Sequence, residues 1–112
     1  MINKIKSRKD FIKIQKNGSK VISAGLVLQY LNNSNQANPS RFGFTASKKV
    51  GGAVHRNKAK RSMRSLFFDV IENFKTKGWD YVLIARKETV HRKYQKLKND
   101  LIWAIKNLKP KI

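Results

Sequence analysis

The sequence predicts an α+β fold, a two-layer α/β sandwich in which helices pack on a sheet. The expected order of elements is helix, strand, strand, helix, strand, helix, and strands on both sides of a helix favour such a sandwich. The apolar residues fall in periodic blocks, which favours a folded chain over a disordered one. With 112 residues and a hydrophobic fraction of 40%, the chain fits a single domain over residues 1–112 with one modest core.

A short helix near the N-terminus is the first expected element. Ser7 and Asp10 resemble a capping box, in which side chains satisfy free N–H groups of the first turn. Phe11 and Ile14 share one face of this helix, either as a core-facing pair or as part of a binding surface. Gly18 is placed to end the helix.

Two stretches rich in β-forming residues follow, over residues 21–31 and 41–47. The first is one long strand or two shorter ones, and an extra short strand is a further possibility. A polar loop over residues 32–40 separates the two stretches. Alternating residues share a face, and these are Leu26, Leu28 and Tyr30 in the first stretch and Phe42, Phe44 and Ala46 in the second.

The second half of the chain predicts a helix, a strand and a helix. A flexible basic turn over residues 48–52 leads into the clearest helix, over residues 53–74. The run over residues 80–86 is typical of a buried strand. A final helix begins at Thr89 or a neighbour, and the tail over residues 109–112 is expected to fray.

Charge is the strongest signal in the composition. The chain has 26 Lys and Arg residues against 6 Asp and Glu residues, which gives a formal net charge of +20. A chain with this charge repels itself when folded, and a bound polyanion relieves the repulsion. Solubility alone needs a net charge of only about 2–8. Nucleic acid is therefore the favoured partner, ahead of an anionic membrane surface.

The sequence excludes several other classes. It has no cysteine, which rules out disulfides and thiolate metal sites and favours a cytoplasmic location. No apolar run approaches the roughly 20 residues of a membrane helix, and the first residues lack the apolar core of a signal peptide. We expect no membrane partner, and no protein partner is predicted.

A basic stretch from Lys48 to Arg64 contains the functional signal. Five of its residues occupy one arc of about 140° on a helical wheel. These residues, which we call the basic arc, are Arg56, Asn57, Lys60, Arg61 and Arg64. Guanidinium groups match phosphate oxygens and stack on bases, and an amide can reach a phosphate, a 2′-hydroxyl or a base edge. Two glycines ahead of the helix leave its N-terminal N–H groups accessible to an anion.

A solvated charged face is the alternative interpretation of the basic arc. Like charges four residues apart weaken an isolated helix by about 0.2–0.5 kcal/mol per pair. No carboxylate is interleaved on the arc, so nothing within it offsets this repulsion. We therefore predict that the arc binds nucleic acid.

Part of the basic stretch forms a specific motif. Its residues are Lys49, Gly51, Ala53, Arg56, Asn57, Lys60, Arg61 and Arg64. Around it lie Ser47-Lys48-Lys49, the strand Phe42-Gly43-Phe44, the strand Asp80–Arg86 and the helix that contains Phe11. In this order and at this spacing, the segments resemble the bacterial ribonuclease P protein family over most of the chain.

The resemblance implies a fold and an activity. Family members have a four-stranded sheet with helices and a left-handed βαβ crossover, as in the second domain of ribosomal protein S5, an exception to the usual hand. They bind a catalytic RNA and help it remove the 5′ leader from precursor tRNA. The chain would be a subunit of an endonuclease, a hydrolase whose RNA performs the catalysis with Mg²⁺.

The resemblance also implies two surfaces that contact RNA. The catalytic RNA would contact Lys48, Lys49, Arg56, Asn57, Lys60, Arg61 and Arg64. A separate cleft between the first helix and the sheet would bind the single-stranded leader, and it would be lined by Phe11, Lys13, Ile14, Val27 and Thr45. Many members have aromatic residues where this chain has Gln15 and Gln29, so stacking is expected to be weaker or supplied by Tyr30.

The residues predict no catalytic group and no metal site in the polypeptide. Metal-dependent cleavage needs clustered carboxylates, and only Asp69 and Glu72 lie close together in the sequence. Cleavage without metal favours two histidines, and His55 and His91 fit ordinary surface positions. The alternatives are a general RNA-binding or ribosomal protein and a nuclease made of protein alone.

Overall fold

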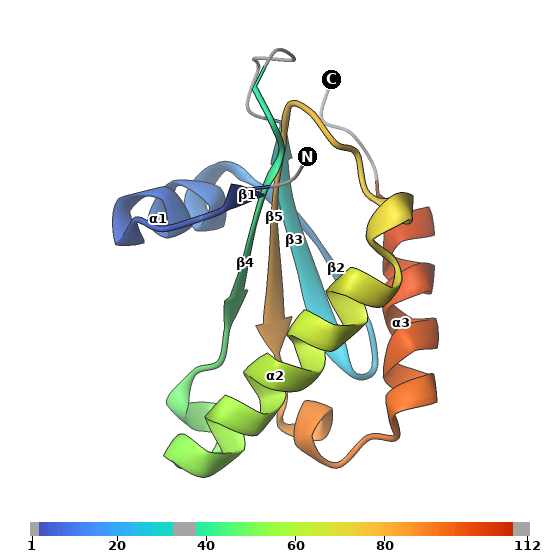
Figure 1. Cartoon of the computed structure of the whole chain (residues 1–112). Coiled ribbons are helices and arrows are strands. Elements are labelled where there is room, and N and C mark those ends of the chain that lie inside the picture. The colour runs from blue at the N-terminus through green and yellow to red at the C-terminus, as the bar shows by residue number, and fades with distance from the viewer. Residues whose placement is uncertain (1–2, 33–37, 109–112) are drawn as a thin grey trace.

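The structure, a computed structural model, describes residues 3–32 and 38–108. A five-stranded sheet with the order β1-β4-β5-β3-β2 is combined with three α-helices (Figure 1). The strands are β1 (Asn3–Lys4), β2 (Ser19–Ile22), β3 (Leu26–Asn32), β4 (Arg41–Thr45) and β5 (Trp79–Ala85). The helices are α1 (Arg8–Asn17), α2 (Ala53–Asp69) and α3 (Tyr94–Lys106), with short 3-10 helices η1 (Lys48–Val50), η2 (Ile71–Asn73) and η3 (Lys87–Val90). None of the described helices is long and apolar enough to cross a membrane.

The segment from β4 through α2 to β5 forms a βαβ crossover. β4 and β5 pair in parallel, with Phe42 opposite Tyr81 and Phe44 opposite Leu83. In Figure 1 both arrows point downwards, β5 lies to the right of β4, and α2 passes in front of the sheet. This path is left-handed, so the crossover has the uncommon hand that the family resemblance implies.

The main core lies between the sheet and the helices α2 and α3. Leu26 and Leu28 of β3 are fully buried there, as the strand alternation predicts. Phe42 stacks on Phe67 of α2 with 4.6 Å between the ring centres. A smaller cluster lies under α1 on the other face of the sheet, and it contains Ile5, Ile14 and Val82. The predicted α+β class is confirmed, and α1 is separated from the two larger helices by the sheet.

The sequence allows an extra short strand but does not place one at β1, and with β1 the sheet has five strands rather than four. Its two residues pair in parallel with β4, with Asn3 opposite Arg41. Two polar residues show no alternation of apolar side chains, which is the signal that identifies a strand. The predicted loop over residues 32–40 lies largely outside the described residues, and the tail over residues 109–112 lies wholly outside them.

The stretch over residues 21–31 contains two strands, which was one of the two options. In the turn between them, the Ser23 hydroxyl donates a hydrogen bond to the Leu26 carbonyl oxygen over 2.6 Å. A Cβ atom on Gly25 would lie 2.5 Å from the Leu97 side chain of α3. The hairpin turn is therefore packed so closely against α3 that a larger residue would force a shift.

Two predicted helix boundaries are wrong. The long helix ends at Asp69, and η2 is a separate turn after it. The final helix begins at Tyr94 rather than at Thr89, which is buried in η3. The Thr89 hydroxyl donates to the Gly25 carbonyl oxygen over 2.5 Å and accepts from the Arg86 N–H over 2.8 Å. The first contact joins residues 64 positions apart, so no local pattern reveals it, whereas the second is a local cap at the start of η3.

Candidate nucleic-acid interface

The start of α2 is shaped by the turn ahead of it, which is a hydrogen-bonded 3-10 turn. The Ser47 hydroxyl oxygen accepts a hydrogen bond from the Lys49 N–H over 3.3 Å. Gly51 has a φ of 141°, and a Cβ atom there would lie 3.0 Å from the His55 side chain, so glycine is favoured. Gly52 precedes the helix, and its first turn has no side-chain cap. The first N–H groups of α2 are therefore open to an anion.

Four residues of the basic arc lie together on the exposed face of α2. Asn57, Lys60, Arg61 and Arg64 line a pocket of about 470 Å³ beside Val54. Arg64 also lies over the Phe44 ring, with 5.9 Å between its guanidinium carbon and the ring centre. The helix thus presents three cations and one amide to the same side, as the helical wheel predicts.

The other predicted contacts to the catalytic RNA lie beside this pocket rather than in it. Arg56 is only partly exposed, and its Nε atom is buried with no hydrogen-bond partner among the described residues. Lys48 and Lys49 are exposed on η1, ahead of the helix. The surface therefore begins at the turn and continues along α2, and Arg56 contributes partly to packing.

Three of the six acidic side chains form close pairs with arginines outside the basic arc. Arg41 binds Asp80 at 2.8 Å and Asp10 at 2.9 Å, which ties α1 to the sheet. The hydrogen bond to Asp80 is the main cause that raises the pKa of the Arg41 guanidinium. Arg92 binds Asp100 at 2.6 Å in the same way. These carboxylates are thus engaged in the fold, and the arc keeps its full positive charge.

The cleft between α1 and the sheet has a volume of about 580 Å³. Of the residues that the family resemblance implies, Phe11, Val27 and Thr45 line it. Ile14 is buried in the small core under α1, and Lys13 is exposed on α1, so neither side chain lines the cleft. The sequence left open whether Phe11 and Ile14 face the core or a binding surface. Each alternative holds for one of them, because Ile14 faces the core and Phe11 lines the cleft.

Several polar residues of this cleft are not implied by the motif. Gln15 and Gln29, which stand where many family members have aromatic residues, both line the cleft, and Gln29 is buried. Arg8 and Lys20 add positive charge at the same cleft. Tyr30 is buried on the opposite, core-facing side of β3, so it does not supply the missing stacking.

A further pocket of about 530 Å³ joins the cleft to the basic arc. Phe11 lines both this pocket and the cleft, while Lys60 and Arg64 line both this pocket and the arc. Lys4 and Lys6 contribute from the N-terminal segment. The two surfaces that the family resemblance treats as separate are therefore continuous. Helical spacing could not show this, because the joining residues come from three distant segments of the chain.

The described residues hold no group of three or more His, Cys, Asp or Glu side chains that could bind a metal ion. Asp69 instead accepts a hydrogen bond from the Tyr94 hydroxyl. Partial burial, together with this hydrogen bond, raises the pKa of Tyr94 to about 12. His55 and His91 are exposed, with 6.4 Å between their ring centres. That the polypeptide supplies no metal site stays a prediction.

A basic helix face without acidic neighbours, continuous with a polar cleft on a sheet, defines an α+β protein that binds nucleic acid. The family model for ribonuclease P matches residues 2–109 of the chain. The chain therefore belongs to the ribonuclease P protein family. It is a protein subunit of the endoribonuclease that processes the 5′ end of tRNA, whose partner RNA performs the catalysis.

Curated relatives and solved structures agree with this assignment. The ribonuclease P protein component of Paramagnetospirillum magneticum is 40% identical over 110 residues, covering 96% of this chain and 83% of that protein. The RNase P protein from Thermotoga maritima has a TM-score of 0.79 at 27% identity, covering 96% of this chain and 98% of that one. The Staphylococcus aureus RNase P protein has a TM-score of 0.75 at 32% identity, with 92% of both chains covered. The predicted family is confirmed.

Proposed function

We propose that the basic arc binds the catalytic ribonuclease P RNA and that the cleft under α1 binds the 5′ leader of precursor tRNA. The observation that carries this proposal is the pocket that joins the two surfaces. Because Phe11 and Arg64 line it together, a leader strand in the cleft lies directly beside RNA bound on α2. The protein thereby brings the substrate strand to the catalytic RNA.

The contacts on α2 suit a folded RNA rather than a particular base sequence. Lys60, Arg61 and Arg64 can neutralise phosphates, and Asn57 can reach a 2′-hydroxyl or a base edge. Lys48 and Lys49 extend this charge to the open N-terminus of the helix. If about six phosphates are neutralised, the logarithm of the affinity falls with the logarithm of salt at a slope of roughly −4 to −5.

The cleft suits a single strand of varying sequence. The Phe11 ring offers a stacking surface that accepts any base, and Arg8 and Lys20 can follow the backbone. Gln15 and Gln29 offer amide groups, which donate and accept hydrogen bonds, in place of further aromatic rings for stacking. The chain would therefore bind leaders with less stacking and more hydrogen bonding than an aromatic cleft provides.

The chemical step belongs to the RNA in this proposal. Asp10, Asp80 and Asp100 are paired with arginines, so they are poor candidates to hold Mg²⁺. We propose that Mg²⁺ is held by the RNA, while this chain supplies charge and positioning in the cytoplasm. Residues 1–112 would act as one domain, because α2 and α3 share one core with the sheet.

A reconstitution assay tests this proposal. Precursor tRNA is incubated with the catalytic RNA at low Mg²⁺, with and without this protein, and leader release is measured. We expect the protein to stimulate cleavage, because it supplies cations that otherwise come from salt. Absence of stimulation would contradict the proposal and favour a general RNA-binding protein, and cleavage by the protein alone would favour a protein nuclease.

A further inference from the structure

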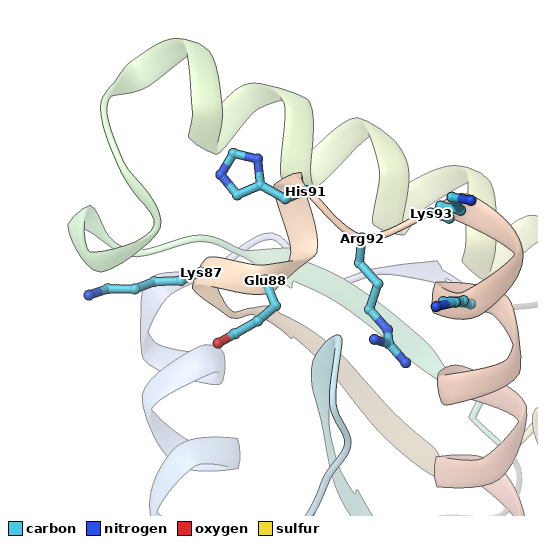
Figure 2. Close-up of a pocket in the computed structure, with 6 residues that line it drawn as sticks. Lys87, Glu88, His91, Arg92 and Lys93 are labelled. Atoms are coloured by element: carbon cyan, nitrogen blue, oxygen red, sulfur yellow. The ribbon is translucent and has the colours of Figure 1, made fainter.

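A second basic pocket lies on the far side of the α2 N-terminus from the basic arc. It has a volume of about 550 Å³ and is formed where η3 meets α3 (Figure 2). Its lining residues are Lys87, Glu88, His91, Arg92, Lys93 and Lys96. None of these positions belongs to the motif of the ribonuclease P family or to the proposed leader cleft, so the pocket needs its own explanation.

The charges of this pocket are only partly neutralised within the protein. Glu88 lies 3.9 Å from Arg86, and Arg92 is bound to Asp100. The other cations are exposed, and they have no ion-pair partner among residues 3–32 and 38–108. These are Lys87, Lys93 and Lys96. Three like charges around one hollow repel each other, and a bound polyanion removes that repulsion.

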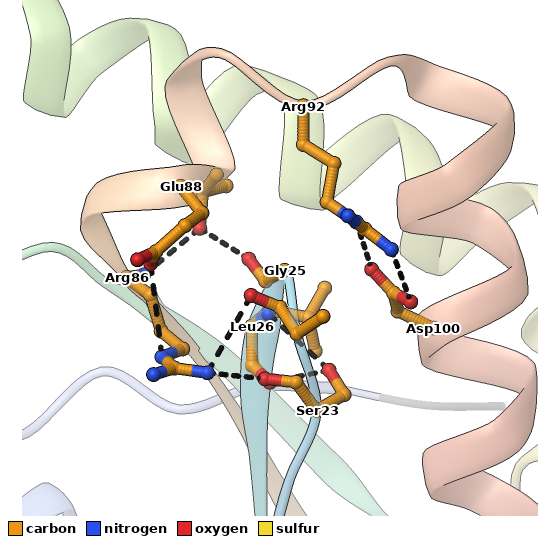
Figure 3. Close-up of polar contacts among 9 residues, drawn as sticks. Ser23, Gly25, Leu26, Arg86, Glu88, Arg92 and Asp100 are labelled. Carbon is orange, nitrogen blue, oxygen red and sulfur yellow. Dashed lines mark hydrogen bonds and ion pairs between the residues drawn. The ribbon is translucent and has the colours of Figure 1, made fainter.

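The backbone that presents these lysines is fixed by contacts with the β2–β3 turn. Figure 3 shows Arg86 reaching back to this turn, where its guanidinium donates to the Ser23 carbonyl oxygen over 2.6 Å. A Cβ atom on Gly25 would lie 2.5 Å from Asp100 Oδ2 and 2.9 Å from Arg92 Cδ. The corner between η3 and α3 is therefore packed against the hairpin, and its lysines extend from a supported backbone.

The position of the pocket identifies the polyanion that fits it. η3 lies against η1, which presents Lys48 and Lys49 at the start of the RNA-binding surface. His91 of the pocket approaches His55 in the first turn of α2, with 6.4 Å between their ring centres. The basic surface thus continues around the α2 N-terminus, from the arc on one side to the pocket on the other.

We propose that the pocket between η3 and α3 is a second docking site for the catalytic RNA and binds phosphates of a strand that passes around the α2 N-terminus. The catalytic RNA would contact the protein on both sides of α2, and the leader would stay in the cleft under α1. This inference rests on the proposed function, because it takes the catalytic RNA as the ligand of the basic arc.

A charge-matched comparison of two triple variants tests the proposal. The pocket variant is Lys87→Gln with Lys93→Gln and Lys96→Gln. The control variant is Lys75→Gln with Lys77→Gln and Lys106→Gln, which removes the same charge from exposed positions. The control positions lie just before β5 and at the end of α3. In Figure 1 these two segments are at the opposite end of the molecule from the start of α2. Circular dichroism and thermal unfolding first establish that both variants are folded.

The expected result is a selective loss of affinity for the catalytic RNA. Each phosphate contact contributes about 0.7–0.9 to the slope of log affinity against log salt concentration. Loss of three contacts should therefore make this slope shallower by roughly 2 in the pocket variant. We expect its Kd to rise about tenfold at moderate salt, against less than threefold in the control. Preference for precursor over mature tRNA should not change. Equal losses in both variants, or an unchanged pocket variant, would overturn the proposal.

Directed cleavage gives an independent readout, because the chain has no cysteine of its own. Lys87→Cys labelled with an iron chelate should cut the catalytic RNA at a defined strand, and Lys77→Cys with the same label should not. If the wild-type protein stimulates the RNA but Lys87→Cys produces no cut, this inference alone fails. If the wild-type protein neither binds nor stimulates the RNA, the proposed function fails with it.

Discussion

Two pairs of arginines in two regions of this protein differ in their partners. In the first region, Arg41 and Arg92 are bound to carboxylates at 2.6–2.9 Å. In the second region, Arg61 and Arg64 line an exposed pocket on α2 without an acidic neighbour. Both regions use the same side chain, but the paired arginines connect elements of the fold and the unpaired ones face outward.

This difference shows how a chain with six acids can keep a fully charged binding face. Asp80 is only 2% exposed and faces Arg41, so its charge stabilises the sheet and is hidden from α2. Asp10 serves the same arginine from α1. These two acids thus neutralise a cation inside the fold, and the cations of α2 are left for the polyanion.

The largest effect is expected in the paired region. Arg41→Met leaves the buried Asp80 carboxylate without its cation. Removing one partner of a fully buried pair costs about 3–5 kcal/mol, and the partial exposure of Arg41 reduces this to about 2–3 kcal/mol. Thermal unfolding should therefore shift down by roughly 10 °C. Arg41→Lys is the control, and its unfolding midpoint should fall less because it keeps a positive charge. An unchanged midpoint in Arg41→Met would show that the pair does not stabilise the fold.

In the unpaired region, the loss should appear in binding and not in stability. Arg61→Ala with Arg64→Ala should weaken binding of the catalytic RNA about 10- to 30-fold, because two phosphate contacts are lost. The salt slope should become shallower by about 1.5. Unfolding should occur at or above the wild-type temperature, since repulsion between like charges is relieved. A strongly destabilised variant would contradict the contrast between the two regions.

A smaller effect is expected at the pocket that joins the cleft to the basic arc, and it distinguishes binding of the leader from binding of the catalytic RNA. Phe11→Ala should lower the preference for precursor over mature tRNA about fivefold, because a stacking surface is lost. Gly43→Ala should act in the same direction, since its Cβ atom would lie 2.5 Å from the Phe11 ring and displace it. Arg61→Ala, which lies outside the joining pocket, should keep the preference. If all three variants lost the preference equally, the cleft and the basic arc would not have distinct binding roles.

An anion should stabilise the unpaired region selectively. Sulfate at ten times its Kd would stabilise the wild-type protein by about 1.4 kcal/mol, which is a rise of several degrees in the unfolding midpoint. The variant with Arg61→Ala and Arg64→Ala should gain less, and it controls for the general stabilising effect of sulfate. Circular dichroism spectra and midpoints that respond equally in both proteins would refute coupling between this face and folding.

The smallest effect concerns Tyr94, whose pKa is raised from 10.0 to about 12. A raised pKa means that the folded state favours the protonated phenol. Its contribution to stability is therefore present below pH 10 and is lost as the pH rises towards 12. Tyr94→Phe should be slightly less stable at pH 8 and should lose less stability between pH 10 and 12, measured by denaturant unfolding. Identical pH profiles would argue against this contribution.

The features that the sequence predicted correctly depend on local periodicity. Asn57, Lys60, Arg61 and Arg64 share a face because the helical repeat places them there, and the structure brings them into one pocket. The alternation of Leu26 and Leu28 in β3 likewise follows from the pleat of a strand. Periodicity requires only neighbouring residues, so these features were accessible without a structure.

The features that the sequence did not predict depend on residues far apart in the chain. Arg41 meets Asp10 and Asp80 across separations of 31 and 39 residues. Thr89 of η3 donates a hydrogen bond to the Gly25 carbonyl oxygen across a separation of 64 residues. β1 is too short and too polar to show a pattern of its own. The strand register pairs Arg41 with Asp80, and the packing of α1 and η3 against the sheet brings the other residues together.

The place of β5 in the sheet has a consequence for synthesis of the chain. β5 is hydrogen-bonded to both β3 and β4, so the two halves of the sheet have no connection before Trp79–Ala85 leaves the ribosome. At about 5–20 residues per second, translating from the end of α2 at Asp69 to the end of β5 at Ala85 takes roughly 1–3 s. α2 needs only local contacts and precedes β5 in the chain, whereas the parallel pairing that encloses the core forms late. The nascent chain therefore carries its most positively charged helix through an interval in which no completed sheet supports it.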